Sequence, residues 1–436
     1  MKGKIIKLKN GGVLIYERSK LNNATAMEIG FSVGAYNEKI KGTAHLLEHT
    51  LFKKTKNRTN QQVETDRNRV AFLNASTSMD YILIKLYRTN KLLKESMEFV
   101  YDVLMNSVVD DEYLESEKGV VKEELNMCLD GESRDIYVKN YIQALSKARF
   151  ASDIVGKTPE NIDTITFKEL QSFKRKYFIG NNFVVSVVSN QRLCKIKKLL
   201  NEIFVKNIKY VGDYKTPKMY FEVSKIDKKT SLKIYNNNQE KIAVMMSFKI
   251  NANELEIFGK NYNYTFLARY LSGSQGELFL KLRNKGLVYR LDVDISSFKE
   301  DSLFNIVFET SKEKIKEILD IIKDEIYKIV TSELERSLTE DYKKNLEFFS
   351  DEKMPVKNTV RCHVNINDYL SFGKLFRLTK KQKKKLREGV CPQEIKKVAN
   401  IIFNKNTEMF VTVLGKVTKK YVPDLEYFKN SFLIGE

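Results

Sequence analysis

The chain has 436 residues, 42% of them hydrophobic and 30% charged, which is enough for two or three globular domains with buried cores. No segment approaches the ~18 consecutive apolar residues of a membrane-spanning helix, so the composition excludes a helical membrane protein. The formal charge of +20 comes from basic residues that are scattered apart from a run at 380–385, and no nucleic-acid-binding motif accompanies them, so we expect neither nucleic acid nor a membrane as partner.

Strand-like and helix-like segments alternate in the first half of the chain. The expected strands cover residues 13–16, 26–33 and 81–87, where β-branched and apolar residues gather between Gly and Asn. The expected helices cover residues 43–54, 92–106 and 111–129, where apolar residues follow helical periodicity. This half closes with a helix at 167–177 and a strand at 181–189.

The last helix–strand pair recurs near the end of the chain. A helix at 392–402 begins with Pro392 in its first turn and precedes an apolar strand at 406–415. The two copies lie about half the chain apart, which indicates two similar halves. Residues 206–218 have few apolar side chains and are the expected linker. We therefore predict two α+β domains, residues 1–210 and residues 220–436.

The four cysteines and the N-terminal residues bear on the cellular compartment. Cys128, Cys194, Cys362 and Cys391 lie far apart without a CxxC pair, which is typical of free thiols in a reducing compartment. The first ten residues are basic but lack an apolar segment, so we expect no secretory signal. The cytoplasm is the expected location.

The motif His45-Leu-Leu-Glu48-His49 is the strongest chemical signal in the chain. Residues i and i+4 of a helix share a face, so both imidazoles can reach one zinc ion, and Glu48 can take a proton from a water that the metal activates. The alternative is a pair of surface histidines on an amphipathic helix. The chain has only three histidines and two occur at this spacing, which favours the metal site. We interpret the third, His363, as structural.

Residues 42–58 around this motif resemble the metal-site stretch of the pitrilysin family, the inverzincin (HxxEH) zinc peptidases, including bacterial processing peptidases. The resemblance extends to residues 8–12, 33–35, 74–81 and 115–127. It implies a zinc metalloendopeptidase with one Zn²⁺ per chain that hydrolyses peptides or leader and precursor segments. It also implies two homologous α/β-sandwich-type domains, each a mostly antiparallel sheet with helices on one face, joined by a linker as half of a clamshell. The first domain would hold the metal.

The family takes its third zinc ligand from a Glu about 75 residues after the second His. Here Glu124 aligns with that ligand, and Glu123 is the nearest rival. Glu117 lies two helical turns before Glu124 on the same face, where the resemblance implies that it assists catalysis by supporting a ligand. The alternative is that this helix is acidic and solvated.

The resemblance also implies substrate-binding elements. The segment Asn74-Ala75-Ser76-Thr77 is similar to the family's edge strand, to which a peptide adds as an extra strand; the alternative is an ordinary polar loop.

In the second half, Arg283 and Tyr289 match an Arg/Tyr element that contacts substrate near the scissile bond, with Tyr289 a hydrogen-bond donor to the oxyanion. Their spacing of six residues departs from the usual seven, which puts the register of Arg283 in doubt. The alternative is a basic helix end followed by a buried Tyr. Some members of the family split these roles between two chains, so we expect a homodimer, or a heterodimer with a related chain. The substrates are expected to be peptides, and the basic charge balance would suit acidic leaders. A non-catalytic or partner-dependent subunit of a heterodimeric processing protease is the alternative.

Overall fold

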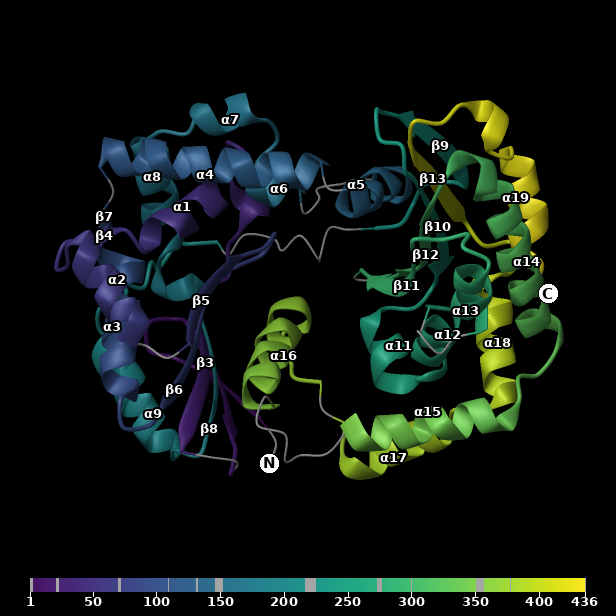
Figure 1. Ribbon diagram of the computed structural model, residues 1–436. Coiled ribbons are helices and arrows are strands. Elements are labelled where there is room, and N and C mark those ends of the chain that lie inside the picture. The colour runs from purple at the N-terminus through teal and green to yellow at the C-terminus, as the bar shows by residue number, and fades with distance from the viewer. Residues whose placement is uncertain are drawn as a thin grey trace. The chain divides into compact units, whose positions relative to one another are not determined.

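A computed structural model of the chain is drawn in Figure 1. It describes residues 3–20, 23–69, 72–108, 110–130, 132–145, 152–215, 225–272, 277–298, 300–349, 357–376 and 378–435. Contacts within the chain divide it into two compact units, and neither is continuous in sequence. Unit 1 comprises Met1–Leu129, Arg149–Glu222 and Glu352–Arg377, and unit 2 comprises Asp130–Ala148, Val223–Asp351 and Leu378–Glu436.

Unit 1 is built on a six-stranded sheet with the order β1-β2-β8-β3-β6-β5. Its strands are β1 (Lys4–Lys7), β2 (Val13–Arg18), β3 (Ala24–Phe31), β5 (Phe72–Thr77), β6 (Ile82–Thr89) and β8 (Phe183–Ser189). Neighbouring strands are antiparallel except β2 and β8, which are parallel. Strand β5 lies at one edge, so one side of its backbone has no neighbouring strand among the residues that the structure describes.

Helices cover one face of this sheet and carry the candidate site. They are α1 (Thr43–Leu51), α2 (Asn60–Arg69), α3 (Leu93–Asn106), α4 (Asp111–Asp130), α6 (Ser152–Val155), α7 (Pro159–Asp163), α8 (Phe167–Tyr177) and α9 (Leu193–Leu200), with the small sheet β4 (Lys54–Thr55) and β7 (Ser107–Val108). Shorter turns of helix are η1 (Ala35–Asn37), η2 (Gly180–Asn182) and η3 (Asn201–Val205). The core between the two layers includes Ile29, Phe31, Leu46, Val100 and Leu125, all fully buried.

Unit 2 repeats this plan. Its sheet has the order β11-β12-β10-β13-β9, with β9 (Ser231–Asn236), β10 (Ile242–Ile250), β11 (Arg290–Ser297), β12 (Ser302–Thr310) and β13 (Met409–Gly415). Read from β9, this order matches β2-β8-β3-β6-β5 of unit 1, and β9 and β13 form the corresponding parallel pair. The predicted internal repeat is therefore a repeat of strand order, and the expected α+β fold with mostly antiparallel sheets is confirmed.

Unit 2 has its own set of helices, several of which pack on its sheet and others on one another. They are α11 (Glu254–Lys260), α12 (Asn263–Ser272), α13 (Glu277–Asn284), α14 (Ile315–Thr331), α15 (Arg336–Phe349), α17 (Lys380–Glu388), α18 (Pro392–Ile402) and α19 (Leu425–Phe432), with the turns η4 (Lys312–Lys314) and η5 (Lys419–Tyr421). The predicted helices at 167–177 and 392–402 coincide with α8 and α18. Other predicted ends differ by up to three residues. The predicted linker is described up to residue 215 and otherwise lies outside the described residues.

Each sheet also has one helix on its second face, and that helix comes from the other half of the chain. Helix α16 (Lys357–Phe372) packs on β3 and β8 of unit 1, on the side away from α3 and α9 (Figure 1). Helix α5 (Glu132–Ala144) packs on β10 and β13 of unit 2. Ile136 of α5 joins Ala243 and Met245, whereas Val244 and Met246 face the other helices, so α5 covers the opposite face.

The exchanged helices are held by buried polar contacts. In unit 1, Arg361 and Asn365 of α16 both pair with the fully buried carboxylate of Glu17. In unit 2, Asn140 of α5 accepts a hydrogen bond from Ser247 at 2.9 Å and donates to the Phe410 carbonyl at 3.0 Å. Because buried polar groups need partners, these contacts specify which helix lies on each sheet. The expectation that helices cover one face of each sheet is therefore incomplete, because one polar helix also covers the other face.

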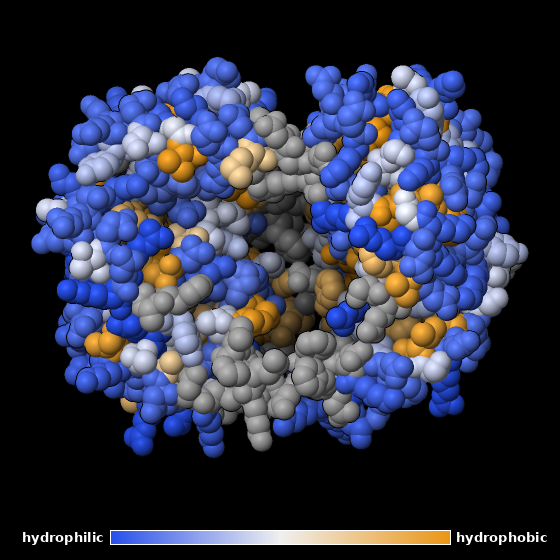
Figure 2. Space-filling view, viewed as in Figure 1, coloured by the Kyte–Doolittle hydropathy of each residue, from blue (hydrophilic) through white to orange (hydrophobic). Residues whose placement is uncertain are grey.

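The outer surface agrees with the composition. The face in Figure 2 is largely hydrophilic, with hydrophobic residues scattered over it. Among the described helices, none combines the length and the apolar content that crossing a bilayer requires. Cys194, Cys362 and Cys391 are free thiols as expected, whereas the side chain of Cys128 lies outside the described residues.

Candidate metal centre

The metal motif lies on α1, whose start is held by a buried carboxylate. Glu38 accepts hydrogen bonds from the backbone N–H groups of Gly42 and Ala44, both at 2.9 Å. Gly42 has φ +90°, a left-handed conformation that favours glycine, and an added Cβ would lie 2.7 Å from the Val155 carbonyl. The carboxylate satisfies amide groups that the first turn leaves unpaired, so it fixes where α1 begins.

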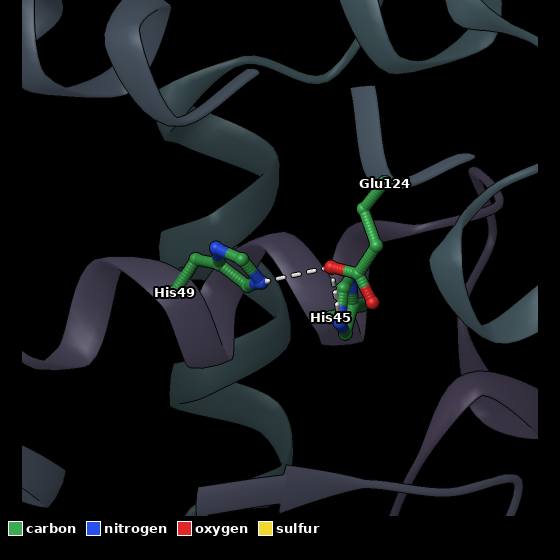
Figure 3. Close-up of side chains that lie close together, drawn as sticks. All are labelled: His45, His49 and Glu124. Carbon is green, nitrogen blue, oxygen red and sulfur yellow. Dashed lines mark ion pairs between the residues drawn. The ribbon is translucent and has the colours of Figure 1, made fainter. Parts of the chain in front are cut away.

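The apolar face of α1 orients the two histidines. Ala44, Leu46, Leu47 and Leu51 are buried in the core of unit 1. The opposite side of the helix presents the imidazoles, and α4 presents Glu124 to them (Figure 3). Because an α-helix has 3.6 residues per turn, burial of this apolar face directs the residues on the other face toward the metal site.

The side chains of His45, His49 and Glu124 converge. The Oε2 atom of Glu124 lies 3.7 Å from Nε2 of His45 and 3.6 Å from Nε2 of His49, and one ligand atom from each residue lies within 4.8 Å of the others. Ligands about 2.0–2.1 Å from a tetrahedral zinc ion are roughly 3.3–3.4 Å apart. The donor set and its spacing therefore fit a zinc ion after small side-chain movements. Glu123, the rival, is exposed and does not belong to this group.

Glu117 contacts His49 through the ring nitrogen that does not face Glu124. Its Oε2 atom lies 3.1 Å from Nδ1 of His49, and its Oε1 atom lies 2.7 Å from Nζ of Lys53. A proton on Nδ1 leaves Nε2 with a free lone pair, the form in which an imidazole binds metal. Burial alone would raise the pKa of Glu117, but hydrogen bonds from His49 and Lys53 outweigh burial and lower it. Glu117 is thus held ionised, as a ligand-orienting carboxylate should be.

Glu48 occupies the same helix between the histidines but has different neighbours. Its Oε2 atom accepts a hydrogen bond from the Thr77 hydroxyl at 2.7 Å. Burial raises the pKa of Glu48, and the hydrogen bond from Thr77 only partly offsets that rise. For His49, burial lowers the pKa, but the bond to Glu117 and the carboxylates nearby raise it above the usual value. The positive charge of a bound metal would lower both.

Strand β5 brings the predicted substrate edge to this site. Thr77 is opposite Ile82 in β6, and the Ser78 N–H donates to the Tyr81 carbonyl at 2.8 Å. Because hydrogen-bonding direction alternates along an antiparallel strand, Ser76 and Asn74 turn their backbone groups toward β6. The backbone groups of Ala75 and Thr77 therefore point away from the sheet. The edge position agrees with the expectation for residues 74–77, and substrate binding there stays a prediction.

Arg283 and Tyr289 lie together in unit 2. Arg283 is near the end of α13, and its Nη1 atom lies 3.4 Å from the Val288 carbonyl and 3.5 Å from that of Tyr289. The Tyr289 side chain is 62% exposed, so the alternative of a buried tyrosine is wrong. Lys241 Nζ lies 5.4 Å from the ring centroid. The substrate-contacting roles of Arg283 and Tyr289 stay predictions.

His363 is engaged elsewhere. It lies on α16, where Nδ1 is 3.1 Å from both carboxylate oxygens of Glu28 and Nε2 is 3.0 Å from Nδ2 of Asn367. These contacts support the structural interpretation.

Sequence reasoning missed three groups around the site: Glu38 as a cap, Lys53 as a partner of Glu117, and Thr77 as a partner of Glu48. Lys53 was detectable in part, because it follows His49 by one helical turn.

Comparison with known proteins places these residues in a wider group. Residues 13–153 match the family described as Insulinase (Peptidase family M16), and residues 164–346 match the one described as Peptidase M16 inactive domain. An uncharacterized zinc protease of Bacillus subtilis, YmxG, is 23% identical over 345 residues, covering 76% of this chain and 80% of that protein. The bovine mitochondrial-processing peptidase subunit beta is 30% identical over 199 residues, covering 44% of this chain and 40% of that one.

A solved structure shares the fold. The crystal structure of a protease from Helicobacter pylori superimposes with a TM-score of 0.78 at 20% identity and covers 95% of this chain and 99% of that one. At this identity the likeness concerns the fold alone.

Proposed function

The chain belongs to the M16 peptidase family, the pitrilysin family that its metal-site stretch resembles, and on that premise we propose that it is a zinc-dependent endopeptidase. The observation that carries the proposal is the convergence of His45, His49 and Glu124 beside the carboxylate of Glu48. The proposed substrates are peptides or leader and precursor segments.

Two imidazole nitrogens and one carboxylate oxygen form a donor set that suits zinc at a catalytic site, with a position left open. His45, His49 and Glu124 would hold the ion, and Glu117 would hold His49 in the ligating tautomer. A zinc ion bound there supplies Lewis acidity, which lowers the pKa of a water and polarises the scissile carbonyl.

Glu48 is the proposed general base. Its carboxylate would accept a proton from the attacking water and deliver it to the leaving amine, so that the peptide bond breaks without releasing an amide anion. Tyr289 would donate a hydrogen bond to the oxyanion, and Arg283 would contact the substrate backbone. For these last two the support is the family resemblance together with their exposure and proximity.

The proposed substrate is an extended peptide paired to β5. Outward-facing backbone groups at the edge favour binding through main-chain hydrogen bonds, which tolerates many sequences. The charge of +20 favours acidic leaders. A homodimer, or a heterodimer with a related chain, and a cytoplasmic location are further parts of the proposal.

A second candidate is a non-catalytic or partner-dependent subunit of a heterodimeric processing protease. The match of residues 164–346 to a family described as an inactive domain favours it. The complete set of ligands together with Glu48 opposes it.

Digestion of a peptide library by the purified chain tests the proposal. We expect cleavage that a chelator abolishes and zinc restores. Glu48→Gln should retain zinc but lose about 10²–10⁴-fold in kcat, because general-base catalysis contributes that much. Glu124→Gln should lose zinc, whereas the matched control Glu123→Gln should keep both zinc and activity. A zinc-loaded wild-type chain that cleaves nothing would favour the subunit instead.

A further inference from the structure

Thr77 is at once the last residue of the edge strand β5 and the hydrogen-bond partner of Glu48. We propose that Thr77 is a positioning residue that holds the Glu48 carboxylate in a fixed orientation relative to a peptide paired with β5. The inference rests on the proposed function, because it assigns Thr77 a role in that same reaction.

The contact has the geometry of a strong hydrogen bond. The hydroxyl oxygen of Thr77 lies 2.7 Å from Oε2 of Glu48, at the short distance typical of a hydroxyl donating to a carboxylate. The bond engages one carboxylate oxygen and leaves Oε1 to accept the proton of a water. It also restricts rotation of the carboxylate, which without this bond would be free to adopt other orientations.

The donor itself is rigidly placed. A β-branched side chain has few accessible rotamers, and the register Thr77↔Ile82 fixes the backbone against β6. The hydroxyl of Thr77 is thus directed at the base, while the backbone groups of Ala75, two residues earlier, point away from β6.

One short stretch of β5 therefore has two roles, to bind the peptide and to orient the general base. A peptide that pairs with Ala75 is aligned by the same backbone that orients Glu48, so the distance between the scissile bond and the base is set by two residues of one strand. A purely structural role, in which the bond only fastens α1 to β5, would instead predict loss of folding or of zinc on removal of the hydroxyl.

The test removes the hydroxyl and then restores it. In Thr77→Val we expect kcat for peptide hydrolysis to fall about 10–100-fold, as for loss of a hydrogen bond to a charged group, with KM within about twofold and zinc content unchanged. Thr77→Ser should recover most of kcat. The matched control is Thr50→Val on α1, whose buried hydroxyl donates to the Leu47 carbonyl at 2.8 Å and not to Glu48.

A double-mutant cycle isolates the pair. In the Glu48→Gln background, Thr77→Val should not change the residual kcat, because the base that Thr77 orients is already absent. The equilibrium affinity for a fluorescent peptide should be the same in Glu48→Gln and in the double variant, which is a readout that needs no turnover.

Three outcomes would overturn the inference: an unchanged kcat in Thr77→Val, an equal loss of kcat in the Glu48→Gln background, or a loss of zinc or of folding in both Thr77 variants. An inactive wild type would overturn the proposed function and this inference with it. An active wild type with an unaffected Thr77→Val overturns the inference alone.

Discussion

Three glutamates at the metal centre show how neighbours assign different tasks to one kind of side chain. Glu117 lies between His49 and Lys53, so its pKa is lowered and it stays ionised. Glu48 has one hydroxyl partner, whose hydrogen bond only partly offsets the effect of burial, so its pKa is raised. Glu124 points its oxygen between the two imidazoles. The three tasks are to orient a ligand, to accept a proton and to ligate, and each follows from local contacts.

Zinc affinity should depend on the contact between Lys53 and Glu117 and on that between Glu117 and His49. We expect Glu117→Gln to lower zinc affinity about 10–100-fold, the usual effect of removing a carboxylate that orients a metal ligand. Lys53→Met should have a smaller effect in the same direction, because it acts one contact further away. Competition with a chromophoric chelator measures both. Lys54→Met, an exposed lysine, is the control, and an unchanged affinity in Glu117→Gln would contradict the prediction.

Helix α1 depends on a cap that comes from outside the helix. Glu38 is 6% exposed and accepts hydrogen bonds from the N–H groups of Gly42, just before α1, and of Ala44 in its first turn, whereas Glu169 in the capping box of α8 is partly exposed. A buried acceptor is worth more than a more exposed one because water does not compete for the amides.

Replacing the cap should therefore destabilise the metal helix. Glu38→Gln should cost about 1–2 kcal/mol of unfolding free energy, because an amide oxygen is a weaker acceptor than a carboxylate. Glu169→Gln should cost less than about 0.5 kcal/mol, since Gln also serves in a capping box. Denaturant unfolding followed by circular dichroism compares the two. Equal costs would show that the Glu38 carboxylate does not cap α1 in solution.

Helix α8 carries a lysine that makes stability depend on pH. Lys174 is 7% exposed, and its Nζ atom donates to Ser107 Oγ at 2.6 Å without a carboxylate contact among the described residues. Burial, with Lys56 nearby, lowers the pKa of Lys174 to about 7 from its ordinary 10.5. Between these values the unfolded chain binds a proton that the folded protein has released, so this contribution to stability rises with pH.

Lys174→Met should remove that rise. The wild-type unfolding free energy minus that of Lys174→Met should grow from pH 7 to pH 10 by at most about 1.4 kcal/mol per pH unit. Unfolding curves at four pH values measure the difference. Lys176→Met, an exposed lysine of the same helix, should run parallel to wild type. A difference that stays constant with pH would contradict the lowered pKa.

Over the whole molecule, the two halves of the chain exchange a helix. Residues of α16 pair with Glu17 and Glu28 of the unit 1 sheet, and residues of α5 pair with Ser247 and Thr412 of the unit 2 sheet. A cut near residue 220 would therefore leave buried polar groups exposed on both sheets, although the sequence shows a repeat of two halves.

Separate expression of the two halves tests this dependence. We expect residues 1–215 alone to aggregate, or to melt about 10 °C or more below the full chain, because several buried polar groups lose their partners. Co-expression with residues 225–436 should restore a stable complex in size-exclusion chromatography. A monomeric, cooperatively folded fragment 1–215 with the stability of the full chain would contradict the prediction and favour independent domains at 1–210 and 220–436.

The parts that the sequence alone settled are local. The spacing of His45, Glu48 and His49 on one helix, and the spans of α8 and α18, follow from periodicity, which depends on neighbours within one or two turns. Glu124 was identified through family resemblance, because nothing in residues 111–130 by themselves distinguishes a ligand from a solvated acid. The structure shows that the Glu124 carboxylate lies close to both histidines.

Tertiary structure alone decided the contacts that give these residues their environments. Thr77 meets Glu48 across 29 residues and Glu117 meets His49 across 68, and α16 meets β3 across most of the chain. Such pairings depend on strand order and on which face of each sheet remains to be covered. Periodicity reports which side of an element is apolar, but it does not report which distant element will pack against it.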